Sequence, residues 1–331
     1  MGAIEVDRHR REEGCAMQPF LSIVIANCNY GRFLEEAIQS VLSQTGEGLE
    51  QVCPDEVELI VIDGGSTDNS VEIIKKYACG LPAGVARGDS SILRLPSTPI
   101  VYWVSEPDKG QSDAFNKGFS KTSGKFLTWL NADDVMLPGT IKKLKIAAEK
   151  HPECEWFVGG CFWLDPGMRI VNCGRGRPFS EIRYREGNVS VWGPSSFFTK
   201  RLLDSVGGVD VRFHYTMDTD LWLRFACKAG ARYMPFCDYA WGLRLHPDAK
   251  MSRHNFSKDG KLMLGCKNVI DERQRRAEEQ KRREGTWKAE YFSPQPVTWL
   301  ILMFSVSWFR VFAARMDLWR YRGKYYREYF K

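Results

Sequence analysis

Short apolar runs alternate with amphipathic stretches from residue 21 onward, a pattern typical of repeated β-α units around a mostly parallel sheet. Buried strands are predicted over residues 21–26, 57–62, 101–104 and 126–130. Apolar positions at helical spacing predict helices over 33–42, 71–77 and 111–119, and a further helix from Pro138 to about Lys150. Polar clusters follow the second and fourth strands, at the edge where open α/β sheets bind ligands.

The pattern changes after His151, and the second half is predicted to be mixed α+β. Residues 156–164 and 169–172 predict a hairpin, and apolar positions after the MDTD segment predict a helix. Residues 271–288 hold seven Lys or Arg and five Asp or Glu, which is typical of a solvated helix or linker. We therefore divide the chain into a flexible N-terminus (1–19), a first half (20–150), a second half (151–268), and a charged linker with an amphipathic helical tail (269–331).

Composition narrows the class of protein. A chain of 331 residues with 44% hydrophobic residues can bury a large core, and a net charge of +6 is too small to predict a nucleic-acid partner. Ten cysteines include no C-x-x-C pair, so we expect buried thiols in a reducing compartment. Residues 1–19 carry charges with no apolar run behind them, so no signal peptide is predicted and a cytoplasmic location is expected.

Two adjacent carboxylates, Asp133 and Asp134, follow the fourth predicted strand in the segment NADD. Such a pair repels itself unless a cation or hydrogen-bond donors compensate it. Mg²⁺ and Mn²⁺ prefer oxygen ligands and often share carboxylates with nucleotide phosphates. The pair therefore indicates either a divalent metal site or a solvated cap of the next helix.

Asp63 ends the second predicted strand and opens the turn DGGSTD. Its carboxylate could accept a hydrogen bond from a base N–H or stabilise its own turn. No G-x-G-x-x-G follows a strand and no G-x-x-x-x-G-K-[ST] occurs, which argues against a dinucleotide dehydrogenase and a P-loop NTPase.

Two further features of the second half could carry chemistry. Asp218 and Asp220 open a helix; capping explains one carboxylate, and the other could be a general base. His246 follows an apolar run in RLHP, where it is either structural or placed to reach a diphosphate or a metal.

Several segments, in this order, resemble family 2 glycosyltransferases of the GT-A fold. They are LSIVIANCNYGRFLEEAIQSVLSQT, VELIVIDGGSTDNSVEIIKKY, VYWVSEPDKGQSDAFNKGFSKTSGKFLTWLNADDVMLPGTI, WGPSSFFTKRLL and MDTDLWLRFACKAG. They span about residues 20 to 250. The resemblance implies a GT-A type, Rossmann-like sheet flanked by helices, with residues 20–150 as the nucleotide-sugar-binding half and 151–268 as the acceptor-binding and catalytic half.

The resemblance also implies roles for individual residues. NADD occupies the position of the family's Asp-x-Asp motif, so Asp134 is expected to bind Mn²⁺ or Mg²⁺, and Asp133 to face the ribose or share the ion. Asp63 falls at the base-recognition position, and Lys109 is placed to approach the diphosphate. Asp218 best matches the family's catalytic base.

The remaining candidate site residues come partly from the resemblance and partly from the residues themselves. In the order of the chain, they are Ala26 and Asn29 in the first nucleotide-binding loop, Trp192 and Ser195 on the acceptor wall, Asp220 as the reserve base and His246 as a second metal ligand. The first loop reads ANCN where a Pro or Thr is expected near its start, and the segments 45–56 and 79–99 are longer than usual. The Q-x-x-R-W motif of processive synthases is absent, which favours transfer of single sugars.

The tail leaves two alternatives open. Residues 297–309 are uncharged, 13 residues against the roughly 20 that span a bilayer, and basic residues follow them. The segment 297–331 either lies in a membrane interface, which suits a lipid-linked acceptor, or packs on protein.

Together these observations predict an inverting, metal-dependent glycosyltransferase that moves a sugar from a nucleotide-diphosphate sugar, expected to be a UDP-sugar, to a glycan or lipid-linked acceptor. A nucleotidyltransferase and a non-catalytic nucleotide-binding or membrane-docking module are the alternatives.

Overall fold

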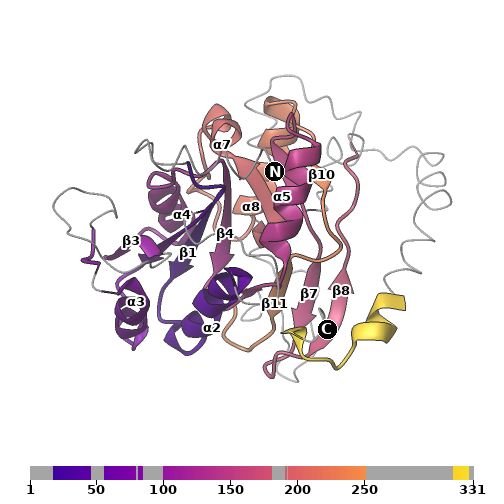
Figure 1. Cartoon of the computed structure of the whole chain (residues 1–331). Coiled ribbons are helices and arrows are strands. Elements are labelled where there is room, and N and C mark those ends of the chain that lie inside the picture. Colours follow the sequence, from indigo (N-terminus) through magenta and orange to yellow (C-terminus); the bar gives the residue numbers. More distant parts are fainter. Residues whose placement is uncertain are drawn as a thin grey trace, which may run out of the picture.

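The strands of the computed structural model form two sheets, flanked by helices (Figure 1). The structure describes residues 18–45, 56–79, 81–84, 100–180, 191, 193–250 and 316–327. The larger sheet has the order β10-β6-β9-β4-β1-β2-β3, and the smaller has the order β5-β11-β7-β8. The strands of the larger sheet are β1 (Leu21–Asn27), β2 (Val57–Asp63), β3 (Ile100–Ser105), β4 (Phe126–Asn131), β6 (Trp156–Val158), β9 (Ser196–Thr199) and β10 (Met234–Pro235). Those of the smaller are β5 (Val135–Met136), β7 (Cys161–Leu164), β8 (Ile170–Gly174) and β11 (Trp241–Arg244).

Helices cover both faces of the larger sheet. The face packed by α2 (Gly31–Leu42), α3 (Ser70–Ala78) and α5 (Thr140–Lys150) receives Leu59 and Val61 of β2. The opposite face, packed by α4 (Gln111–Phe119), α7 (Lys200–Val206) and α8 (Met217–Leu223), receives Ile60 and Ile62. Because alternate side chains point to opposite faces, a strand buried along its whole length must be apolar throughout, as β2 nearly is. The mostly parallel sheet flanked by helices confirms the predicted fold class.

Two close contacts fix the helices that carry the site. Trp222 of α8 stacks on Trp129 of β4, with ring centroids 5.2 Å apart and planes at 5°. Gly118 brings α4 so near β1 that a Cβ at this position would lie 2.2 Å from Cγ1 of Val24. These contacts hold the last turns of α4 and α8 against the central strands.

The second half differs in detail from its prediction. The apolar run 156–164 is not one strand: β6 belongs to the larger sheet and β7 to the smaller. The expected hairpin is therefore formed by β7 and β8, which pair antiparallel. The helix predicted from Pro138 begins at Thr140, after Gly139 with φ 72°. The described residues also include three short helical turns: η1 (Ser43–Thr45), η3 (Gly193–Ser195) and the π-helical η4 (Arg224–Lys228).

The C-terminal segment, residues 316–327, packs beside β8 (Figure 1). It is helical over 316–321, and Tyr325 then forms a β-bridge with Arg169. Asp317 accepts hydrogen bonds from Arg175 and Tyr239, which anchor the segment. The predicted linker 271–288 and the rest of the tail lie outside the described residues.

Two further findings concern the described part of the chain. No disulfide joins its cysteines, and Cys28, Cys79 and Cys227 are exposed where buried thiols were predicted. None of its helices combines the length and the hydrophobicity needed to cross a bilayer.

Candidate active site

The predicted polar clusters meet at the carboxyl ends of the central strands. Asp63 lies opposite Asn27 of β1 and Ser105 of β3, while Ala26 lies opposite Asn131 of β4. The parallel register thus brings the DGGSTD turn and the NADD segment to one edge of the sheet, as open α/β sheets require for a ligand site.

Asp63 is fully buried, and both carboxylate oxygens accept hydrogen bonds from the protein. The donors are Asn27 Nδ2 (2.6 Å), the Ser66 amide (2.9 Å) and hydroxyl (2.5 Å), and the Ser105 hydroxyl (2.6 Å). These four bonds fill the usual acceptor capacity of a carboxylate. Asp63 therefore stabilises its own turn, and the base of a nucleotide could bond to Asp63 only by replacing one of these donors.

The first loop lies over the DGGSTD turn. Asn29 adopts a left-handed backbone with φ 55°, and its Oδ1 accepts from the Thr67 amide at 2.8 Å. Its own amide donates to Ser66 Oγ at 2.8 Å. Ala26, at the end of β1, is half-buried. The loop is thereby held against the turn that ends β2, with both predicted nucleoside residues at this edge.

The structure gives the two carboxylates of NADD different surroundings. Asp134 is fully buried and accepts from Asn131 Nδ2 (2.7 Å) and the Arg244 amide (3.0 Å). Burial, with the nearby charge of Asp133, raises the pKa of Asp134 well above its usual value. The Asp133 side chain keeps 17% of its surface exposed. The geometry therefore favours Asp133 over the expected Asp134 as the residue that meets a ligand.

His246 contacts the same carboxylate. Its Nε2 lies 3.1 Å from Asp133 Oδ2, and its ring packs 4.5 Å from the Phe33 ring. Arg244, two residues earlier, donates from Nε to the Asp133 carbonyl at 2.9 Å. Successive odd or even positions of an extended chain share a face, so β11 and its extension present Arg244 and His246 to one loop.

The pair Asp133 and His246 fits an octahedral divalent ion. Two cis ligands at about 2.1 Å from such an ion lie about 3 Å apart, and the two side-chain atoms here are 3.1 Å apart. Among the described residues no three His, Cys, Asp or Glu side chains converge on one point. The remaining ligands would then be water and diphosphate oxygens, as is usual for Mg²⁺ at nucleotide sites.

The start of α4 borders this edge. Gln111 donates to Asn131 Oδ1 at 2.8 Å and accepts from Lys250 Nζ at 3.0 Å. The Lys109 side chain is exposed, while its amide donates to Asp113 Oδ2 at 3.1 Å. The start of α4 thus carries the exposed side chain of Lys109, and Gln111 links Lys250 to Asn131 of the NADD segment.

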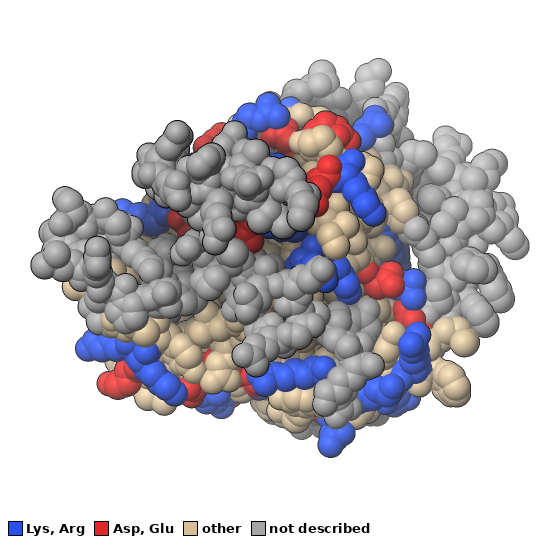
Figure 2. Space-filling view, in the orientation of Figure 1, with Lys and Arg blue, Asp and Glu red and all other residues tan. Residues whose placement is uncertain are grey.

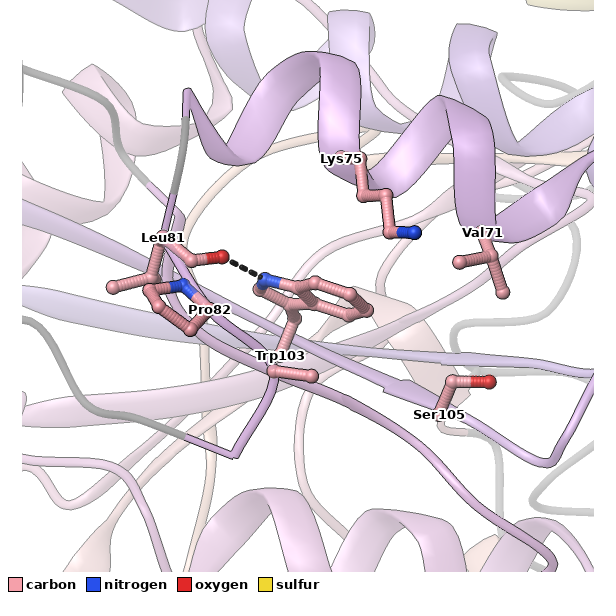
Figure 3. Close-up of a pocket in the computed structure, with 7 residues that line it drawn as sticks. Val71, Lys75, Leu81, Pro82, Trp103 and Ser105 are labelled. Carbon is pink, nitrogen blue, oxygen red and sulfur yellow. Dashed lines mark hydrogen bonds between the residues drawn. The ribbon is translucent and has the colours of Figure 1, made fainter.

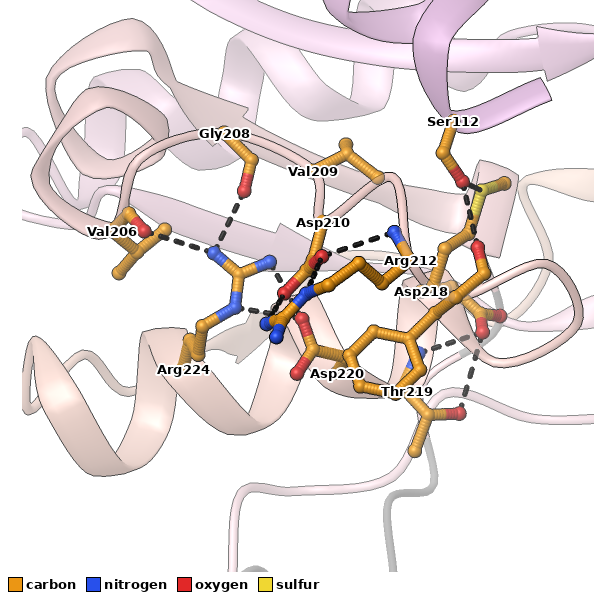
Figure 4. A network of polar contacts seen from close by, with 12 residues as sticks. Ser112, Val206, Gly208, Val209, Asp210, Arg212, Asp218, Thr219, Asp220 and Arg224 are labelled. Carbon is orange, nitrogen blue, oxygen red and sulfur yellow. Dashed lines mark hydrogen bonds and ion pairs between the residues drawn. The ribbon is translucent and has the colours of Figure 1, made fainter. Parts of the chain in front are cut away.

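The two acidic residues of α8 have separate surroundings (Figure 4). Asp220 is buried and pairs with Arg224 one turn later, at 2.7 Å. Asp218 is half-buried, and its Oδ1 accepts from the Thr219 amide at 2.6 Å. The ion pair gives Asp220 a structural role in this structure, and its expected role as reserve base stays a prediction.

Asp218 lies close to the end of β4. A Cβ at Gly193 would be 3.5 Å from Asp218 Oδ2 and 3.2 Å from Trp129 Cζ2, so the three residues are immediate neighbours. Ser195, in the same turn, is fully buried, and its carbonyl accepts from the Gly159 amide. Ser195 therefore cannot line an open acceptor wall here, contrary to prediction. Trp192 lies outside the described residues.

One pocket of about 530 Å³ lies between α3 and the edge strand β3. Figure 3 shows Lys75 and Val71 above it and Trp103 beneath, with the indole N–H donating to the Leu81 carbonyl at 2.6 Å. Among the pocket's lining residues, Ser105 connects it to Asp63. The pocket thus adjoins the DGGSTD turn from the side of the edge strand.

Sequence reasoning missed four polar residues that hold this site together. They are Glu36, Ser105, Gln111 and Arg244. Arg244 had a usable signal, because Arg and His two positions apart on a predicted strand share a face. The others are recognised by contacts between elements that are distant in the sequence.

Comparisons with known proteins define the class. The mannosyltransferase PcManGT from Pyrobaculum calidifontis, solved with GDP-Man and Mn²⁺, aligns with a TM-score of 0.53 and 15% identity over 91% of this chain and 75% of that one. This likeness shows a GT-A glycosyltransferase fold.

The sequence relatives give the family. The model for Glycosyl transferase family 2 matches residues 22–158. The uncharacterized glycosyltransferase Rv1514c of Mycobacterium tuberculosis is 31% identical over 214 residues, 63% of this chain and 69% of that protein. The uncharacterized glycosyltransferase alr2836 of Nostoc is 32% identical over 124 residues, 38% of this chain, so this match spans less than a third (31%) of that relative. The chain belongs to glycosyltransferase family 2 and is an enzyme of that class.

Proposed function

We propose that this glycosyltransferase moves a single sugar, with inversion, from a nucleoside-diphosphate sugar to a hydroxyl of a glycan or lipid-linked acceptor. The observation that carries the proposal is the Asp133–His246 pair at the nucleotide edge of the sheet, with Asp218 beside Gly193 and Trp129 near the end of β4. UDP-sugars are the donors expected from the sequence, and the GDP-Man of the Pyrobaculum enzyme makes GDP-sugars the second candidate.

In this reaction Asp218 serves as general base. It takes the proton of the acceptor hydroxyl while the hydroxyl oxygen bonds to the anomeric carbon and the bond from that carbon to the diphosphate breaks. Its partly exposed position beside Gly193 suits contact with an acceptor. On the donor side, Ala26, Asn29 and Asp63 would border the nucleoside.

A divalent cation, Mn²⁺ or Mg²⁺, would be held by Asp133 and His246 and would neutralise charge on the departing diphosphate. Asp134 would support this site from beneath, because it fixes the NADD loop to β11 through the Arg244 amide. Lys109, exposed at the start of α4, would add a positive charge on the diphosphate.

The C-terminal segment supports contact with an anionic membrane surface. Trp319 is 82% exposed and Met316 is 48% exposed, one helical turn apart, while Asp317 between them faces the protein. Basic side chains lie on the surface of the molecule near the end of the chain (Figure 2), and Arg320, Arg322 and Lys324 of the segment are exposed. An enzyme at the cytoplasmic face of a membrane would meet a lipid-linked acceptor there. Flotation with anionic vesicles should weaken in Trp319→Ser and be absent with neutral vesicles.

The proposed donor reaction is tested by release of nucleoside diphosphate from UDP-, GDP- and dTDP-sugars without acceptor. One donor should be hydrolysed with Mn²⁺, and both EDTA and Asp133→Ala should abolish the release. Release of pyrophosphate instead would favour a nucleotidyltransferase. No release from any donor, together with no metal-dependent nucleotide binding, would favour a non-catalytic module.

A further inference from the structure

Glu36, on the side of α2 that faces the smaller sheet, connects two parts of the molecule that are distant in the sequence. Its Oε2 accepts from Arg244 Nη2 at 2.7 Å. Its Oε1 accepts from the hydroxyl of Tyr325 at 3.2 Å and faces that of Tyr326 at 3.5 Å. One carboxylate therefore joins β11 to the C-terminal segment.

Arg244 carries this connection to the NADD loop. Its side chain is 6% exposed and lies 4.7 Å from the Phe33 ring, so burial and stacking limit its freedom. From this position Nε donates to the Asp133 carbonyl at 2.9 Å, and the backbone amide donates to Asp134 Oδ1 at 3.0 Å. Arg244 thus fixes the main chain of Asp133, whose side chain contacts His246.

Backbone hydrogen bonds and burial fix the positions of Tyr325 and Tyr326. The Ile170 amide donates to the Lys324 carbonyl at 2.9 Å, and the Tyr326 amide donates to the Met168 carbonyl at 3.1 Å. Tyr326 is 1% exposed, and Asp317 anchors the start of the segment through Arg175. Residues 323–326 therefore form a strand-like edge of the smaller sheet with a fixed register.

We propose that Glu36, Tyr325 and Tyr326 are positioning residues of the donor site: docking of the C-terminal segment fixes Glu36, which through Arg244 holds Asp133 where it binds the cation. This inference rests on the proposed function, since it assumes a cation on Asp133. It assigns to the tail a part in donor binding that is separate from any contact with a membrane.

The expected size follows from what supporting hydrogen bonds do at metal sites. Removal of a partner that orients a metal ligand typically lowers metal affinity about 10- to 100-fold. Glu36→Gln removes the charge opposite Arg244 and should weaken Mn²⁺ binding by about tenfold. The double variant Tyr325→Phe/Tyr326→Phe is one contact further away and should weaken it by about threefold to tenfold.

The chain offers a matched control on the same helix. Glu35, next to Glu36, accepts from the Tyr77 hydroxyl at 2.8 Å and from Lys76, on the side that faces α3. Tyr77→Phe and Glu35→Gln therefore remove a comparable tyrosine–glutamate contact without touching Arg244. Both should leave Mn²⁺ binding unchanged.

The experiment is calorimetric titration of the full chain with Mn²⁺ at saturating UDP, repeated with GDP, alongside melting curves of every variant. Weaker Mn²⁺ binding in Glu36→Gln and the double tyrosine variant, with unchanged controls and kcat restored at high Mn²⁺, supports the relay. Equal Mn²⁺ affinity in all variants would overturn it, as would a loss of binding sites at unchanged affinity, which reflects unfolded protein. Failure of the unsubstituted chain to bind Mn²⁺ with either nucleotide would instead refute the proposed function.

Discussion

Replacement of Asp220 and Asp218 by Asn, one at a time, should separate a structural carboxylate from a catalytic one. Asp220 and Arg224 form an ion pair whose side chains are 12% and 14% exposed, and Arg224 also donates to the carbonyls of Val206 and Gly208. Loss of one partner of a buried pair costs about 3–5 kcal/mol. Because Asn keeps an acceptor oxygen, we expect the lower end, about 3 kcal/mol. For a domain of about 200 residues this lowers Tm by about 6–12 °C.

The two variants are compared by thermal unfolding and by donor hydrolysis at a temperature where both remain folded. Asp220→Asn should melt early and keep kcat within about threefold of the parent, since its carboxylate is engaged by Arg224. Asp218→Asn should melt with the parent and lose about 10²- to 10⁴-fold in kcat. The opposite pattern, with Asp220→Asn stable and inactive and Asp218→Asn active, would refute both assignments.

Two further predictions concern stability. Gly118→Ala places a methyl group 2.2 Å from Val24 Cγ1, so urea unfolding should show a loss of about 1–3 kcal/mol that Val24→Ala partly restores. If Gly118→Ala alone is neutral, the packing of α4 on β1 is looser than described. Burial by itself would raise the pKa of Asp317, but hydrogen bonds from Arg175 and Tyr239 outweigh it, and the pKa lies below its usual value. The stabilisation is therefore present above about pH 4 and lost progressively as the pH falls through the lower folded value. Asp317→Asn should lower Tm at pH 7, and a Tm gap that does not shrink as the pH is lowered below about 4 would contradict this.

Much of the first half, residues 20–150, could be predicted, because its signals are local. The buried strands read as apolar runs, and the turn after Asp63 and the NADD segment stand directly at strand ends. A parallel sheet then brings those ends together without any further information. The fold class follows from the same alternation of strands and helices.

The parts that could not be predicted depend on long-range packing. Asp133 and His246 are 113 positions apart, and Glu36 and Arg244 are 208 apart. Asp134 is buried and Asp133 is not because β11 packs against Asp134, a long-range contact that hydrophobic periodicity could not reveal. The run 156–164 misled for a related reason, since continuous hydrophobicity does not show where a chain passes from one sheet to another.

The place of β9 in the larger sheet bears on how the protein can be made. β9 pairs antiparallel with both β4 and β6, so the strand that fills the gap between them is synthesised after both. Until residues 196–199 leave the ribosome, one edge of β4 has no partner. A recombinant fragment ending at residue 150 would keep that edge open, and open hydrophobic edges recruit other chains. Residues 20–150 and the second half of the chain are therefore expected to fold and express well only together.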